Sequence, residues 1–131
     1  MSREIKFRGW DSVNEVMLPV ESINFREGYV SLNEGDNSLT DTLEMIELMQ
    51  YTGLKDKNGK EIYEGDILSI KIYSGDKVIV EGKTVVEFKD GCFGVIWGHD
   101  KAFLSLNSFF KAKFEVIGNI YENPELLRGE K

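Results

Sequence analysis

The chain has 131 residues and a formal net charge of −7, with 41% hydrophobic and 11% aromatic residues, which predicts one globular domain, residues 1–131, folded around one core. Its one cysteine, Cys92, and one histidine, His99, exclude an internal disulfide and a Cys/His zinc cluster. The charged start and the lack of a long apolar run argue against a signal peptide and a membrane span, so we expect a cytoplasmic protein.

The negative charge is concentrated in the first part of the chain. Residues 1–50 carry four Lys and Arg against ten Asp and Glu, whereas the remaining 81 residues carry twelve against thirteen. Because nucleic-acid binding depends on Lys and Arg near the phosphates, nucleic acid is not the expected partner. A local basic face that includes Lys55, Lys57 and Lys60 stays an open alternative.

Alternating apolar and polar residues predict strands through the first 32 residues. The segment 5–10 alternates in this way, and 16–20 reads as an edge or a strand end because it contains Pro19. Residues 23–32 read as two short strands folded at Gly28.

Residues 38–51 fit two structures. Leu39, Leu43 and Ile46 have helical spacing, with Ser38 or Thr40 as a cap, which favours a short helix at about 40–46 followed by extended chain. The alternative is a capped turn and then a strand from Ile46 to Tyr51.

Strand-like segments separated by glycine turns continue through the second half, at 67–73, 78–80, 84–88, 92–97 and beyond. Asp90-Gly91 predicts a hairpin, and Pro124 predicts a short C-terminal helix. The expected fold is mainly β: a small SH3-like or related barrel, or a folded sheet, with one or two short helices.

The stretch QYTGLKDKNGKEIYEGDIL, residues 50–68, is dense in turn signals. Asn58-Gly59 predicts a two-residue type I′ turn, Gly53 interrupts the preceding run, and Glu64-Gly65-Asp66 is typical of the turn that leads into a barrel strand. The resulting structural turn motif consists of Gly53, Asn58, Gly59, Glu64, Gly65 and Asp66. We expect Leu54, Ile62, Tyr63, Ile67 and Leu68 to face inward, and Lys55, Asp56, Lys57, Lys60 and Glu61 to stay in water.

This stretch, together with REIKFRGWD near the start and FEVIGNIYENPELL near the end, resembles the YopX-like family of small bacteriophage and prophage proteins. The resemblance covers about a third of the chain. It implies a mostly β architecture and a phage or prophage origin, in a bacterial cytoplasm. It supplies no activity and no catalytic residues.

The acidic side chains near the turn motif could in principle bind Mg²⁺ or Ca²⁺ through their oxygens. The calcium-loop pattern fails, because counting from Asp56 puts Lys60 at the fifth position and Ile67 at the twelfth. We therefore predict no metal and no cofactor. The acidic residues considered are Asp56, Glu61, Glu64 and Asp66.

Cys92, His99 and Asp100 are the residue types of a cysteine nucleophile, a histidine base and an acid that orients it. Neighbouring residues of an extended segment point to opposite faces, so Asp100 is poorly placed to orient His99. Cys92 fits a small apolar strand residue, and we predict no catalytic residue.

Aromatic and basic residues are interleaved in IKFRGW and FFKAKFE, which would suit stacking of single-stranded nucleic acid on a barrel. The favoured interpretation is that these aromatics fill the core. The candidate binding surface consists of Trp10, Lys55, Lys57, Lys60, Phe109, Lys111 and Lys113.

The expected function is that of a non-enzymatic phage accessory protein that binds a host or phage protein. Self-association through an exposed strand edge is a further expectation. The alternatives are a single-stranded nucleic-acid-binding small β-barrel and an uncharacterised enzyme.

Overall fold

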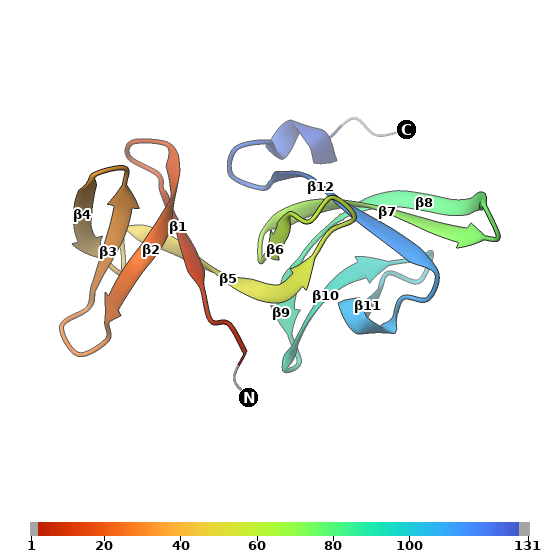
Figure 1. Ribbon diagram of the computed structural model, residues 1–131, viewed down its shortest axis with the longest axis horizontal. Helices are drawn as coiled ribbons and strands as arrows, with labels where there is room; N and C mark the ends of the chain where they lie inside the picture. The colour runs from red at the N-terminus through yellow and green to blue at the C-terminus, as the bar shows by residue number, and fades with distance from the viewer. Residues whose placement is uncertain (1–2, 129–131) are drawn as a thin grey trace. The chain divides into compact units, whose positions relative to one another are not determined.

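The computed structural model describes residues 3–128 and confirms a mainly β protein (Figure 1). The chain divides into two compact units, with the boundary between Tyr51 and Thr52. No helix in the described part of the chain has the length and apolar character needed to cross a membrane.

The first unit is an antiparallel arrangement with the strand order β4-β3-β2-β1-β5. Its buried cluster consists of Val30, Leu32 and Ile46, against which partly buried leucine, valine and isoleucine side chains pack. The strands are β1 (Phe7–Asp11), β2 (Val16–Asn24), β3 (Tyr29–Glu34), β4 (Asn37–Thr42) and β5 (Ile46–Lys55), the last of which continues into the second unit beside β6 (Glu61–Tyr63).

The second unit adds two three-stranded sheets, in the orders β12-β7-β8 and β11-β10-β9. Figure 1 shows β7 and β8 as a long hairpin with β12 along β7. The elements are β7 (Asp66–Ser74), β8 (Lys77–Val85), β9 (Glu87–Lys89), β10 (Cys92–Trp97), β11 (Ala102–Ser105), β12 (Ala112–Asn119) and the 3-10 helices η1 (Leu106–Ser108) and η2 (Pro124–Leu127).

A second buried cluster lies between these sheets. The aromatic rings of Trp97, Phe109 and Phe114 pack against it edge to face, with centroid distances of 5.6 Å for both Trp97–Phe109 and Phe109–Phe114. Such pairs add about 0.5–1.5 kcal/mol beyond the area they bury. The fully buried members are Ile62, Leu68, Ile70, Val86, Val95 and Leu106.

The predicted helix at 40–46 is wrong. β4 runs to Thr42, a turn closed by the hydrogen bond from Met45 N to Thr42 O follows, and β5 begins at Ile46. Pairing with β3, which sets Leu39 opposite Leu32, overrides the helical spacing. The C-terminal segment forms a single 3-10 turn, Pro124–Leu127, and not the short helix expected.

The small SH3-like barrel is not seen either, because the strand orders within residues 3–128 are those of open sheets with free edges. We expected one core, whereas the buried side chains form two clusters, one in each unit. Each cluster is assembled from residues of its own unit. Whether residues 1–131 behave as a single domain stays a prediction.

Candidate functional site

The turn motif begins with the hairpin that joins β5 to β6. Asp56 O accepts a hydrogen bond from Gly59 N at 3.0 Å, and Asp56 N donates to Lys60 O at 2.8 Å. Three residues therefore form the loop, and Gly59 is left-handed with φ +84° while Asn58 is not. The predicted two-residue type I′ turn is wrong, and the geometry is that of a type I turn followed by a left-handed glycine.

The Asp56 side chain, expected in water, is 8% exposed. Its Oδ1 accepts hydrogen bonds from Asn58 N and Lys60 N, and its Oδ2 accepts one from Val116 N, each at 2.9 Å. Burial raises the pKa of this carboxyl, but these three hydrogen bonds and the nearby Lys60 charge outweigh it and hold the pKa below its usual value. The buried carboxylate thus stabilises the turn through hydrogen bonds to the backbone.

The same turn fixes the edge of β12. Lys57 N donates to Phe114 O at 2.9 Å, and Lys57 Nζ lies 3.6 Å from the Glu115 carboxylate. Because β7 occupies the other edge of β12, this turn shields backbone groups that would otherwise be unpaired. Lys57, proposed as a binding residue, has a structural contact here.

Glu64-Gly65-Asp66 connects β6 to β7 and hydrogen-bonds to the residues that directly follow β8 and β12. Gly65 N donates to Val86 O, and Gly65 O accepts from Ile120 N, both at 2.9 Å. Asp66 Oδ2 accepts a hydrogen bond from Tyr63 N at 2.7 Å, and the residue is 1% exposed. As expected for a turn acid, Asp66 binds the backbone, and Ile62, Ile67 and Leu68 are fully buried around it.

The acidic residues near the turn motif do not form a cluster of carboxylates around a common point. Within residues 3–128, no three His, Cys, Asp or Glu side chains lie close enough to hold a metal ion. Asp56 and Asp66 direct their carboxylates at backbone amides.

The cysteine and the histidine lie at opposite ends of β10. Cys92 begins the strand and is half-buried, with Sγ 3.7 Å from Lys89 O, whereas His99 lies in the exposed turn beyond Trp97. An extended strand rises roughly 3.3 Å per residue, so the two side chains are far beyond hydrogen-bonding reach. They do not form a nucleophile and base pair.

Two residues of the candidate binding surface do not lie at the surface. Trp10 is buried in the first unit, and Phe109 packs into the aromatic cluster of the second, which corrects their assignment to a surface. The neighbouring Phe110, in contrast, is 78% exposed. The lysines of the predicted surface, Lys55, Lys57, Lys60, Lys111 and Lys113, are exposed as expected.

The strongest candidate site is a groove beside β8, which is the outermost strand of its sheet. The groove has a volume of about 550 Å³. Val80 and Gly82 of β8 form one wall, and Ile96 and Trp97 at the end of β10 form the other. The turn residues Gly98, His99 and Lys101, together with Glu81 and Lys83, complete the lining.

Packing inside the second unit shapes this groove. Gly82 has no side chain, and a Cβ there would lie 3.2 Å from the Trp97 ring, so the indole rests against the backbone of β8. The Thr84 hydroxyl donates to Ile96 O at 2.9 Å and joins the two walls at one end. Toward Val80 no described strand pairs with the free side of β8.

Part of β8 is also apolar and exposed. Val78, Ile79 and Val80 are 38%, 57% and 45% exposed. A bulge places Ile79 between the residues paired with Tyr73 and Ile72, and from Val80 to Val85 the pairing with β7 is regular. The sequence predicts a strand at 78–80 but not the groove, because no local pattern determines where a strand lies within its sheet.

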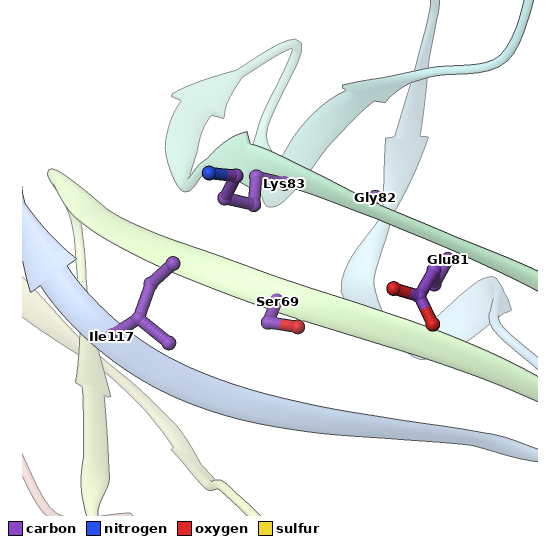
Figure 2. A pocket seen from close by; sticks show the side chains of 5 residues that line it. All are labelled: Ser69, Glu81, Gly82, Lys83 and Ile117. Carbon is purple, nitrogen blue, oxygen red and sulfur yellow. The ribbon is translucent and has the colours of Figure 1, made fainter. Parts of the chain in front are cut away.

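A second hollow, of about 400 Å³, lies on the β12-β7-β8 sheet (Figure 2). Figure 2 shows Ser69 on β7, Glu81, Gly82 and Lys83 on β8, and Ile117 on β12. Its mixture of one hydroxyl, one carboxylate, one ammonium and one apolar side chain is typical of the wet face of a sheet. We assign it no chemistry.

Comparison with known proteins gives a consistent result. Residues 6–128 match the protein family described as YopX protein. The chain is similar to the crystal structure of protein EF1440 from Enterococcus faecalis, with 32% identity over 96% of this chain and 99% of that one and a TM-score of 0.66. It is also similar to the X-ray structure of protein YopX from Bacillus subtilis, with 28% identity over 93% and 97% and a TM-score of 0.67. No curated protein matches it.

Proposed function

The chain belongs to the YopX family, and for this member we propose a non-enzymatic role: it binds an extended segment of another protein along the free edge of β8. We propose further that it is a phage or prophage accessory protein, that it acts in the bacterial cytoplasm, and that its partner is a host or phage protein. The two similar solved structures come from bacteria, which is consistent with this setting.

The groove beside the free edge is the observation that carries the proposal. Unpaired N–H and C=O groups on an edge strand can bind a partner strand, and a groove next to them can receive every second side chain of that partner. Here the regular segment from Val80 to Lys83 supplies the backbone edge, and Ile96 and Trp97 supply the apolar wall.

The lining also indicates the chemistry of the partner segment. Side chains on one face of an added strand would meet Val80, Ile96 and Trp97, which favours apolar residues at alternate positions. The rim carries Lys83, Lys101 and Glu81, and Asp100 lies in the same turn, so charge selects neither sign for the flanks of the partner segment. The expected ligand is a short, extended segment with alternating apolar residues.

Selection of displayed random peptides on the full-length protein tests this function. Peptides with the expected pattern should be enriched on the wild type and lost on the Val80→Asp variant, because the new carboxylate lies in the apolar wall. The matched control is Val13→Asp, since Val13 is exposed in the first unit. An equal yield from wild type and Val80→Asp would contradict the groove as the site.

A second measurement tests strand addition itself. An enriched peptide is methylated at one backbone nitrogen at a time, and we expect binding to be lost at every second position, because only alternate residues of an added strand hydrogen-bond to the β8 edge. If methylation leaves binding unchanged at every position of the peptide, strand addition is refuted. If the wild type self-associates and Val80→Asp is monomeric, the edge binds a second copy, in line with the expected homo-oligomer.

A further inference from the structure

A second exposed surface of the second unit combines aromatic rings with lysines. It lies where the end of β7 meets the start of β12, and we call it the lysine–aromatic surface. Tyr73 N donates to Lys111 O at 2.9 Å, and the next paired residues of the two strands set Ala112 opposite Ile72 and Lys113 opposite Lys71. Its members are Lys71, Tyr73, Phe110, Lys111 and Lys113.

The Phe110 ring faces water, the Tyr73 ring is half-buried, and both lie beside ammonium groups. Phe110 is 78% exposed, and Lys111 Nζ lies 5.7 Å from its ring centroid. Lys113 Nζ lies 5.1 Å from the ring centroid of Tyr73. A groove of about 470 Å³ is lined by Tyr73, Lys111, Ala112 and Lys113 together with the turn residues Gly75 and Asp76, and Phe110 is next to Lys111 outside this lining.

The lysines also make an unfavourable arrangement in the free protein. Lys71 and Lys113 are directly opposite each other across β7 and β12, and like charges at such positions repel. In the described part of the chain none of Lys71, Lys111 and Lys113 is in a salt bridge, whereas Lys57 is bound to Glu115 at 3.6 Å. An anion over the surface would relieve this repulsion.

We propose that the lysine–aromatic surface binds a short stretch of single-stranded nucleic acid. Phosphates would lie near Lys71, Lys111 and Lys113, and unpaired bases would stack on Phe110 and Tyr73, the combination that single-strand-binding surfaces use. An acidic peptide would satisfy the lysines but leave the Phe110 ring in water. Duplex would present its phosphates but keep its bases paired, so the rings favour single strands.

The negative net charge of the chain does not argue against nucleic-acid binding at the lysine–aromatic surface. Residues 1–50 contribute −6 of the total of −7, and the remaining residues contribute −1. Screening confines the effect of distant charges to about 10 Å at moderate salt, so the local excess of lysine governs the surface. The surface is separate from the β8 groove in its lining residues, and the inference does not depend on the protein-binding function.

Fluorescence anisotropy with labelled oligothymidylate and oligouridylate on the full-length protein tests the proposal. We expect binding of at least one oligonucleotide at low salt. A plot of the logarithm of the binding constant against the logarithm of the salt concentration should have a slope of about −2, because each of the three lysine–phosphate contacts contributes about −0.7 on a single strand. Phe110→Ala should weaken binding about tenfold or more, because a stacked base is lost. Lys111→Gln and Lys113→Gln should each reduce the steepness of the slope by about 0.7.

Matched controls exist in the same chain. Phe25 is as exposed as Phe110, at 78%, and lies in the first unit, so Phe25→Ala should bind like the wild type. Lys89→Gln is the control for the lysines. The proposal is overturned if neither oligonucleotide binds at low salt, or if duplex DNA or oligoglutamate binds as well as the single strands. It is also overturned if Phe110→Ala binds as the wild type does, because the surface would then attract polyanions without stacking.

Discussion

The Asp56 carboxylate accepts a hydrogen bond from the Val116 backbone N–H at 2.9 Å, across 60 positions of sequence. This bond lies where β12 has its bulge, between Val116 and Gly118, and where β12 has no strand on the side away from β7. The turn between β5 and β6 therefore closes an edge, while the edge at β8 stays open. This contrast supports the proposal that β8 binds a partner strand, whereas the turn motif stabilises the fold.

Asp56→Asn should destabilise the protein by about 1–3 kcal/mol, because an amide keeps only one acceptor oxygen for three backbone N–H donors. Urea unfolding of the full-length chain measures this. Asp76→Asn, at the exposed turn between β7 and β8, is the control and should change stability by less than about 0.5 kcal/mol. Equal effects of the two substitutions would show that the Asp56 hydrogen bonds add no stability.

The same carboxylate should make stability depend on acid. The pKa of Asp56 is lower in the folded protein than its usual value, so its contribution is fully present above the unfolded pKa of about 3.9 and is lost as pH falls through the folded pKa. The difference in unfolding free energy between wild type and Asp56→Asn should therefore shrink below about pH 4. A difference that stays constant from neutral pH to pH 3 would contradict this linkage.

The position of the turn at Gly59 was predictable from the sequence, but its type and the partners distant in sequence were not. Gly59 marked a turn because few other residues accept its backbone angle, whereas the burial of Asp56 depends on Val116, which no local pattern connects to it. Phe109 and Phe110 are adjacent and equally apolar, yet Phe109 packs against the core and Phe110 is exposed. Their segment is irregular, so alternation carries no information there.

Gly59→Val should lower stability by at least about 1–2 kcal/mol, the usual cost of a left-handed conformation in a residue with a side chain. No atom lies within 4 Å of the position that a Cβ would take, so the cost comes from the backbone alone. Gly59→Asn should cost less, because asparagine accepts positive φ more readily. Thermal unfolding of both variants measures the difference, and an unchanged melting temperature for Gly59→Val would refute the conformation of this turn.

Two buried clusters in one chain raise the question of whether both units unfold together. Leu32 and Leu68 are each 0% exposed, one in each cluster, and truncation of either to alanine should cost about 2–5 kcal/mol. If residues 1–131 form a single domain, both substitutions should lower one shared midpoint, since a two-state transition has no separate parts.

The two tryptophans report on the two units separately, because Trp10 is in the first and Trp97 in the second. In a urea titration followed by NMR, the two indole N–H signals of each protein should disappear together, at one urea concentration in the wild type and at lower ones in Leu32→Ala and Leu68→Ala. β5 belongs to both units, and a continuous strand that pairs with β1 at one end and β6 at the other is the physical reason to expect this coupling. Loss of the Trp10 signal alone in Leu32→Ala would show instead that the first unit unfolds independently.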